Sequence, residues 1–308
     1  MAHVQVSKIS LGTVNFGIPY GAAGDKYQVP EREVEKILAA ALEYGVDHLD
    51  TAIGYGIAQD VLGRVLSSIG KDKFRITSKL LPIPEGDASS TIRQKFIEAI
   101  EESCKRLKVD SLDGCLLHRA TDASGEMADT VFDALNVLKH RGLVKKIGIS
   151  AYTEGEIRAA LSRGALDVVQ VPFSIADQRL LKSKTLDLLK SGGTEIHVRS
   201  VFMQGILLQD QTERSPIFEP EELALRNLAI CCRQNNLTPL QACLGFAMQV
   251  KQIDQLVLGV QSAEQFYQIL QAAQVSLNVA QHFVACDWKD EKLLNPANWD
   301  LMKADLIS

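Results

Sequence analysis

Short apolar runs alternate with longer amphipathic segments along almost the whole chain, and this alternation restricts the fold more than any other feature. Each run is rich in β-branched or aliphatic residues and is followed by a segment with helical periodicity, which is typical of repeated β/α units. The predicted strands cover residues 9–13, 46–51, 74–79, 114–118, 146–150, 168–173, 196–201 and 255–260.

The segments between these strands carry apolar residues at helical spacing. In the first of them, residues 31–44, Val34, Ile37 and Leu38 belong to one apolar stripe, and Gly45 is suited to end the helix because glycine adopts a left-handed conformation easily. The other predicted helices cover residues 58–68, 91–107, 130–141, 154–161, 183–189, 221–234, 239–249 and 263–272.

Eight β/α units predict an α/β fold, an eight-stranded parallel (β/α)8 TIM barrel. Parallel neighbours need crossover connections, and eight right-handed crossovers close most naturally into a barrel. An open doubly wound sheet remains the alternative, but the glycines of the first strand and its loop stand at positions 12 and 17, too far apart for a G-x-G-x-x-G turn. The 308 residues suit a single barrel domain, 1–308, with a tail over 276–308 that we expect to pack on the barrel.

Composition excludes several classes of partner. A formal charge of −5 lacks the basic excess of a nucleic-acid-binding protein. No apolar stretch approaches the roughly 20 residues that span a bilayer, and no secretory leader is evident, so we expect no membrane partner and a cytoplasmic location. The six cysteines form no CxxC pair and lack clustered histidines, which predicts reduced thiols and no metal site. Oligomeric state is not indicated.

Four residues with acid–base chemistry fall where strands run into their loops. Asp50, Lys79 and His118 close the second, third and fourth predicted strands, and Tyr55 stands in the loop TAIGYG after the second. Each has an ordinary structural explanation when taken singly. Asp50 could cap a turn, and Lys79 could be a surface lysine. His118 could be a core histidine, and Tyr55 could be an exposed loop aromatic. Because the carboxyl ends of barrel strands meet at one face, their joint placement predicts a catalytic site.

These four residue types suit the reduction of a carbonyl group. Hydride addition to carbon builds negative charge on oxygen, and a positioned proton donor stabilises that charge. Tyr55 is the candidate general acid, since a neighbouring ammonium such as Lys79 favours an ionised phenol. Asp50 can hold Lys79 in its charged form, and His118 can donate a hydrogen bond to the carbonyl oxygen.

Several segments resemble the aldo-keto reductases, NADP-using barrel enzymes with an Asp, Tyr, Lys and His active site. The resemblance rests on LDTAIGYG, ITSKL and LLHRA around the four candidate residues, and it extends through LGTVNFG, GLVKKIGIS, DVVQVPFS and LVLGVQSAEQ. The start LGT-x-x-FG and the segment RSVFMQGILL are similar to a bacterial branch of that family. The resemblance implies reduction of an aldehyde or ketone, and we hypothesise small or sugar-like substrates.

The resemblance also implies a cofactor site. It covers Gly12, Thr13, Asp50, Ser150, Gln170, Arg199, Ser200, Gln204, Gly205, Gly259, Gln261, Ser262, Gln265 and Gln268. Ser150 and Gln170 would hold the nicotinamide carboxamide, and Arg199 stands where an aromatic residue commonly stacks on the nicotinamide, a role its planar guanidinium can fill.

The remaining positions would contact the phosphates and the adenosine. Ser200 matches a pyrophosphate contact, the loop with Gln204 and Gly205 passes near the phosphates, and Gln268 matches an adenine contact. NADP(H) is the expected cofactor. NAD(H) is the alternative, because residues 261–265 contain no Arg or Lys for a 2′-phosphate.

Two other functions fit part of the pattern. A barrel lyase or aldolase would use Lys79 as a Schiff base, which explains the lysine but leaves Tyr55 and Asp50 without a role. A non-catalytic regulatory subunit would keep the cofactor as a ligand, which the intact set of four residues argues against.

Overall fold

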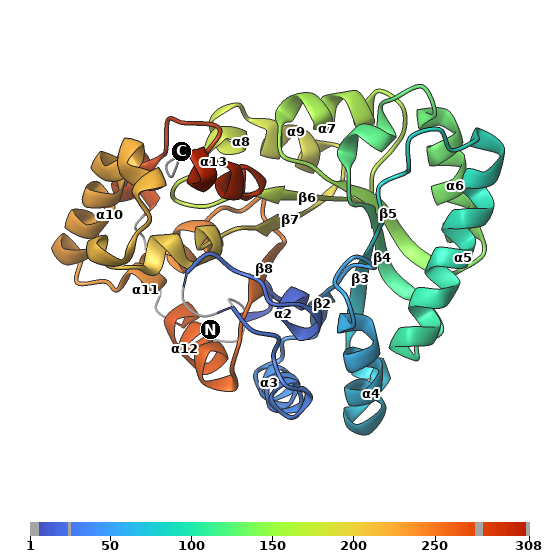
Figure 1. Cartoon of the computed structure of the whole chain (residues 1–308), viewed down its shortest axis with the longest axis horizontal. Helices are drawn as coiled ribbons and strands as arrows, with labels where there is room; N and C mark the ends of the chain where they lie inside the picture. The colour runs from blue at the N-terminus through green and yellow to red at the C-terminus, as the bar shows by residue number, and fades with distance from the viewer. Residues whose placement is uncertain (1–5, 24–25, 275–279, 306–308) are drawn as a thin grey trace.

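The fold is a closed barrel of eight parallel strands, seen here in a computed structural model that describes residues 6–23, 26–274 and 280–305 (Figure 1). Each strand pairs with the next strand along the chain, and β8 pairs with β1 to close the barrel. The strands are β1 (Ile9–Gly12), β2 (His48–Asp50), β3 (Arg75–Leu80), β4 (Leu112–Leu117), β5 (Val144–Ser150), β6 (Val168–Pro172), β7 (Glu195–Arg199) and β8 (Gln255–Gly259). The predicted (β/α)8 architecture is therefore confirmed.

All eight predicted strands are present, and they differ from the prediction only at their ends. Several predicted strands run one or two residues beyond the observed ends. The residues just past those ends keep a backbone bond to the neighbouring strand. Thr13 donates its N–H to the carbonyl of Asp50 at 3.0 Å, and His118 donates to that of Leu80 at 3.2 Å. These residues already belong to the loops that form the mouth of the barrel.

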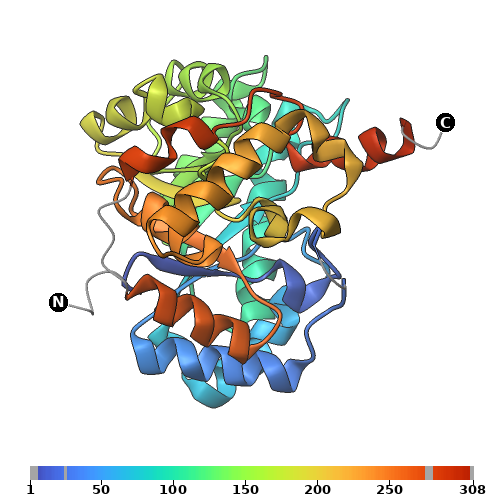
Figure 2. The same cartoon turned by 90° about the vertical axis from the view of Figure 1, so that its left-hand side faces the viewer.

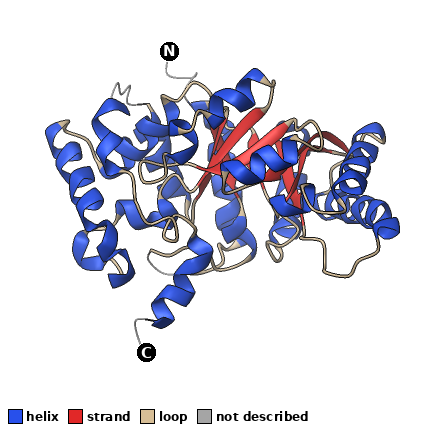
Figure 3. Cartoon of the chain, turned by 90° about the horizontal axis from the view of Figure 1, so that it is seen from above, coloured by secondary structure: helices blue, strands red, loops and turns tan. Residues whose placement is uncertain are grey.

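Helices surround the strands, as the view from above shows (Figure 3). They are α2 (Val14–Gly17), α3 (Glu31–Tyr44), α4 (Ala58–Ile69), α5 (Ser89–Leu107), α6 (Ala128–His140), α7 (Glu154–Leu161), α8 (Arg179–Lys182), α9 (Thr185–Ser191), α10 (Glu222–Gln234), α11 (Pro239–Met248), α12 (Ala263–Ala273) and α13 (Trp299–Asp305). Short 3-10 helices lie at Lys71–Lys73, Ala120–Ala123, Met203–Leu208, Gln211–Glu213, Pro216–Glu221, Ala280–Cys286 and Pro296–Asn298. Among the described residues, no helix is both long and apolar enough to cross a bilayer.

Local sequence explains where many helices begin and end. Gly45 ends α3 in a left-handed conformation with φ of 75°. Capping boxes start α7 at Thr153 and α11 at Thr238, where side chain and backbone exchange hydrogen bonds. The helix predicted at 183–189 is present as α9, which begins and ends two residues later, and a separate short helix, α8, precedes it; Lys184 adopts a positive φ of 61° between the two.

The interior of the barrel is polar below the mouth. Both ring nitrogens of His48 of β2 are hydrogen-bonded. Nδ1 lies 2.6 Å from Ser10 Oγ, and Nε2 lies 3.0 Å from Thr77 Oγ1. Its ring packs edge-on against His197 of β7, with centroids 5.1 Å apart. Strands β2 and β7 are not neighbours, so these rings can meet only inside the barrel. Burial holds the pKa of His48 well below its usual range, which keeps the ring neutral.

The described part of the C-terminal tail packs on the barrel beside α10 and α11 (Figure 2). Trp288 donates its backbone N–H to the carbonyl of Ala176 at 2.9 Å, in the connection after β6. The rings of Trp288 and Trp299 lie 5.6 and 5.1 Å from that of Phe218. Residues 276–279 and 306–308 of the predicted tail lie outside the described residues.

Candidate active site

Three of the four predicted catalytic residues meet around one buried ammonium. Lys79 of β3 places its Nζ 2.5 Å from Asp50 Oδ1, 3.1 Å from the carbonyl oxygen of Thr51 and 3.5 Å from Tyr55 Oη. The side chains of Lys79 and Asp50 are almost completely buried, at 1% and 3% exposure. Each of the three ammonium protons therefore has an acceptor, as a buried charge requires.

The environment of Lys79 favours its charged form. Burial by itself would lower the pKa of Lys79, but the Asp50 carboxylate and the Tyr55 hydroxyl outweigh that effect, so the pKa is raised. The side chain is thus an ammonium at neutral pH. An ammonium can donate hydrogen bonds and stabilise negative charge, but it has no free lone pair to attack a carbonyl carbon.

Gln170 of β6 completes the coordination of Asp50. Its Nε2 donates to Asp50 Oδ2 at 2.7 Å, and both groups are buried. Thr13 Oγ1 also donates to the backbone carbonyl of Asp50 at 3.0 Å. Sequence analysis assigned Gln170 to the cofactor alone, since no local pattern links residues that lie 120 positions apart. Asp50 thus has no carboxylate oxygen left without a partner.

His118 lies beside Tyr55 at the mouth. The two rings are nearly perpendicular, with centroids 6.1 Å apart. Burial, together with the positive charges of Lys79 and Arg199, lowers the pKa of His118 to about 4. The imidazole is therefore neutral at physiological pH, with one nitrogen able to donate a hydrogen bond and the other able to accept one.

The loop that carries Tyr55 packs tightly against the first β/α connection. A Cβ atom at Gly17 would lie 1.8 Å from the carbonyl oxygen of Tyr55 and 2.4 Å from the backbone nitrogen of Ala58. Gly56 adopts a φ of 56°, which glycine tolerates without strain. Gly17, within the segment LGTVNFG, was not among the predicted site residues, yet the approach of Tyr55 requires a glycine there.

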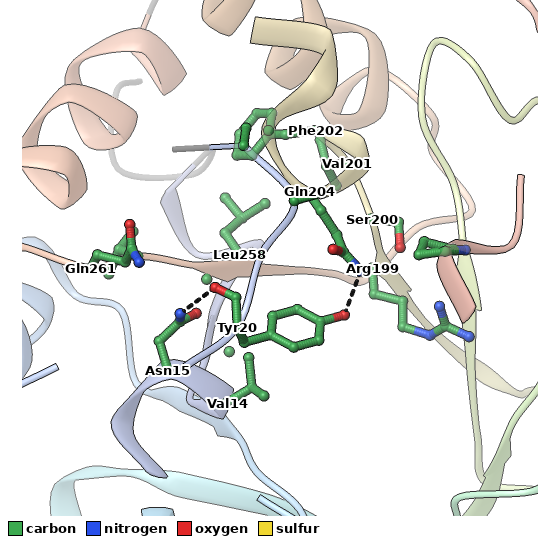
Figure 4. A pocket seen from close by; sticks show the side chains of 18 of the residues that line it. Val14, Asn15, Tyr20, Arg199, Ser200, Val201, Phe202, Gln204, Leu258 and Gln261 are labelled. Atoms are coloured by element: carbon green, nitrogen blue, oxygen red, sulfur yellow. Dashed lines mark hydrogen bonds between the residues drawn. The ribbon is translucent and has the colours of Figure 1, made fainter. Parts of the chain in front are cut away.

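A cleft of about 1090 Å³ opens at the mouth and extends toward α12 (Figure 4). Most of the predicted cofactor positions line it: Gly12, Thr13, Asp50, Gln170, Arg199, Ser200, Gln204, Gly205, Gly259, Gln261, Gln265 and Gln268. Tyr55 lines it as well, whereas Lys79 is buried behind the lining. Tyr20, Lys26 and Tyr152 also face the cleft and were not among the predicted site residues.

Two predicted cofactor positions do not line this cleft. Ser150 is buried at the end of β5. Ser262 is the N-cap of α12, and its hydroxyl accepts the backbone N–H of Gln265 at 3.1 Å. Its side chain therefore satisfies the helix terminus, a role that serine fills in many helices.

Positive φ values cluster in the loop after β7. Ser200, Met203 and Gln204 have φ of 61°, 47° and 52°, and Gly205 has 94°. Such conformations are costly for residues other than glycine and gather at functional sites. Gln204 Nε2 donates to Tyr20 Oη at 2.9 Å, which joins this loop to the one after β1 at the edge of the cleft (Figure 4).

A carboxylate lies at the N-terminus of α12, next to the far end of the cleft. Glu33 of α3 accepts the backbone N–H of Ala263 at 2.8 Å, and its other oxygen pairs with Lys36 Nζ at 2.9 Å. The bond from Ala263 and the nearby Lys36 lower the pKa of Glu33, so it is ionised at neutral pH. Sequence analysis did not identify Glu33, because its partner lies 230 residues away.

Comparisons with known proteins find relatives named as dehydrogenases and reductases. The chain is 26% identical over 291 residues to a D-threo-aldose 1-dehydrogenase from Pseudomonas, covering 84% of this chain and 86% of that one. It is 27% identical over 222 residues to an NADH-specific methylglyoxal reductase from Escherichia coli, covering 66% of each chain.

Solved structures share the fold. The holo form of an aldo-keto reductase from Bacillus halodurans superposes with a TM-score of 0.72 at 21% identity, covering 92% of this chain and 95% of that one. The model of the aldo/keto reductase family matches residues 8–288, which include all eight strands and the four residues at the mouth. This protein therefore belongs to the aldo/keto reductase family.

Proposed function

We propose that this protein is an oxidoreductase that reduces an aldehyde or ketone with hydride from a nicotinamide cofactor, with Tyr55 as the general acid. One observation carries the proposal: the ammonium of Lys79 contacts both Asp50 Oδ1 and Tyr55 Oη. That contact places a permanent positive charge beside the only atom of Tyr55 that can give up a proton.

Each residue at the mouth has a separate role in proton transfer to the carbonyl oxygen. Tyr55 transfers its Oη proton to the carbonyl oxygen, and the Lys79 ammonium stabilises the phenolate that remains. Asp50 keeps Lys79 charged and oriented. The neutral His118 donates a hydrogen bond to the same carbonyl oxygen, which orients the substrate and stabilises the developing negative charge.

The cleft fits an extended cofactor. Its volume is slightly above the range of about 300–1,000 Å³ typical of small-molecule sites, and it connects the mouth to the N-terminal region of α12. A nicotinamide dinucleotide bound there would supply hydride to the substrate carbon. Gln170 and Arg199 would lie at its nicotinamide end, Ser200, Gln204 and Gly205 along its phosphates, and Gln261, Gln265 and Gln268 at its adenosine end.

The choice between NADPH and NADH depends on the far end of the cleft. Resemblance to the family favours NADPH, whereas the Glu33 carboxylate at the N-terminus of α12 would repel a 2′-phosphate bound there. The E. coli relative is named as NADH-specific. We propose that NADH binds at least as tightly as NADPH.

Small or sugar-like carbonyl compounds are the proposed substrates. Two relatives are named for an aldose and for methylglyoxal, which supports this class. The Schiff-base alternative is disfavoured because Lys79 is fully buried and its pKa is raised, so a neutral amine is not available. A purely regulatory role leaves the complete set of Asp50, Tyr55, Lys79 and His118 without a purpose.

Fluorescence titration with NADH and with NADPH, followed by a panel of aldehydes and ketones, tests the proposal. We expect cofactor binding and turnover in the wild type, and loss of turnover with cofactor binding kept in Tyr55→Phe. Tyr267→Phe is the matched control, because that ring packs against Tyr44 away from the cleft. Absence of binding by both cofactors, or borohydride trapping of a substrate on Lys79, would overturn the proposal.

A further inference from the structure

An arginine is held at the mouth on an aromatic platform. Arg199 is the last residue of β7 and lines the cleft beside Tyr20 (Figure 4). Its guanidinium carbon lies 4.2 Å from the ring centroid of Tyr152, which is a stacking distance. The backbone N–H of Tyr152 is in turn bonded to Glu156 of α7 at 2.7 Å. The platform, and with it the guanidinium, is thus tied to a helix terminus.

Among the residues that the structure describes, no acidic side chain neutralises the charge of Arg199. Within residues 6–23, 26–274 and 280–305, no carboxylate lies within ion-pair distance of its guanidinium, although Arg64, Arg106 and Arg179 each pair with an acid. Asp50 lines the same cleft, but its two oxygens are bonded to Lys79 and Gln170. Stacking occupies a face of the guanidinium and leaves its edge, with the N–H donors, open to a ligand.

The positive charge of Arg199 also affects the residues at the proposed site of carbonyl reduction. This charge is one of the causes, after burial and Lys79, that lower the pKa of His118, and it also acts on Tyr20. Arg199 therefore lies within electrostatic range of His118, the proposed hydrogen-bond donor to the carbonyl oxygen. A substrate small enough to reach Tyr55 can place a second group against this arginine.

We propose that Arg199 binds a carboxylate of the substrate, so that the preferred substrates are carbonyl compounds that carry a carboxylate, such as 2-oxo acids, semialdehyde acids or sugar acids. The inference rests on the proposed reductase function and specifies its substrate class. A planar guanidinium matches the two oxygens of a carboxylate with parallel hydrogen bonds, and such charge-assisted pairs are among the strongest in proteins. Arg199 is then a substrate-binding residue, whereas Tyr152 positions it.

Matched pairs of an acid and its neutral methyl ester test the inference: succinic semialdehyde, pyruvate and glyoxylate against their esters. In the wild type we expect kcat/KM to favour the acid by about 10- to 100-fold, the range expected for a charge-assisted contact. Arg199→Gln should abolish this preference, because it raises KM for the acids by about 10- to 100-fold more than KM for the esters. Arg199→Lys should restore part of the preference.

A control variant and a cofactor titration separate this role from a contact with the nicotinamide. Arg64→Gln removes an exposed arginine that pairs with Glu31 and should leave the preference intact. If Arg199 instead contacts only the nicotinamide, Arg199→Gln will weaken NADH binding in fluorescence titrations and affect acids and esters equally. That outcome, or a wild type without preference for the acids, overturns the inference.

A binding measurement keeps the inference testable without turnover. Calorimetry with acetate, propionate and succinate, in the presence of NADH, should show binding to the wild type that is lost in Arg199→Gln. If no carbonyl compound is reduced but these anions still bind through Arg199, the proposed function fails and the carboxylate site stands. If carbonyl compounds are reduced but the anions bind both proteins equally, the inference fails and the proposed function stands.

Discussion

Gln170 donates a 2.7 Å hydrogen bond to Asp50 Oδ2, the carboxylate oxygen that Lys79 leaves free. The two residues belong to strands on different sides of the barrel, so the contact crosses the lumen. It gives Gln170 a structural role that exists before any cofactor binds. That role can be separated from cofactor binding by measuring stability.

Gln170→Leu should lower the free energy of unfolding by about 1–3 kcal/mol in the absence of cofactor, because it leaves a buried carboxylate oxygen without a donor. Urea denaturation measures this. Gln265→Leu is the matched control, since that side chain lies at the exposed end of the cleft and accepts a hydrogen bond from the nearby backbone N–H of Gln261 at 2.8 Å. Equal stability of the two variants would contradict a structural role for Gln170.

The single variant Lys79→Met should have a lower free energy of unfolding than the double variant that carries both Lys79→Met and Asp50→Leu. The single change leaves an unpaired buried carboxylate, which typically costs about 3–5 kcal/mol, whereas the double change removes both charges. Unfolding free energies of the wild type, both single variants and the double variant form a cycle that measures the coupling. Additive effects would mean that the 2.5 Å contact contributes little.

Gly17→Ala should reduce kcat by 10-fold or more in a protein that still folds, since the added methyl group would displace the loop of Tyr55. Circular dichroism establishes folding, and steady-state kinetics establish the loss. Gly155→Ala is the control, because a Cβ there meets its nearest neighbour, Thr153 Oγ1, at an ordinary 3.9 Å. Unchanged kinetics in Gly17→Ala would show that the loop moves without consequence.

The pKa of His118 should be about 4, well below the usual histidine value of 6.5. Its folded pKa is depressed, so the stability linked to it is fully present above pH 6.5 and is lost as the pH falls through 4. NMR of the imidazole measures the midpoint directly, with His118→Gln to assign the signal. We also expect no ionisation of His118 in the pH profile of kcat/KM between about 5.5 and 8. A midpoint above 6 would contradict the neutral, hydrogen-bonding role.

Glu33→Gln should shift cofactor preference toward NADPH. Removing the carboxylate at α12 removes a negative charge that opposes the 2′-phosphate, and we expect the ratio of the Kd for NADPH to that for NADH to fall by about 10-fold. Fluorescence titration of both cofactors measures this ratio. Glu35→Gln, on the same helix and exposed, is the control. An unchanged ratio would place the 2′-phosphate elsewhere.

The sequence by itself determined the architecture and the candidate reacting groups. The strand runs, the helices with Gly45 or a capping box, and the positions of Asp50, Lys79 and His118 at strand ends all follow from local patterns with periods of two or three to four residues. A barrel brings the carboxyl ends of all its strands to one face, so residues found by local pattern also meet in space.

Only the tertiary structure decided which side chains that are distant in sequence contact each other. The bond from Gln170 to Asp50, the contact of His48 with His197 inside the barrel and the capping of α12 by Glu33 join residues with no common local pattern. It also placed Ser150 and Ser262 outside the cleft and set Arg199 facing it, stacked on Tyr152 and with no acidic partner among the described residues. Such contacts depend on how strand register and helix packing set distances of a few ångströms between elements, which propensity and periodicity do not encode.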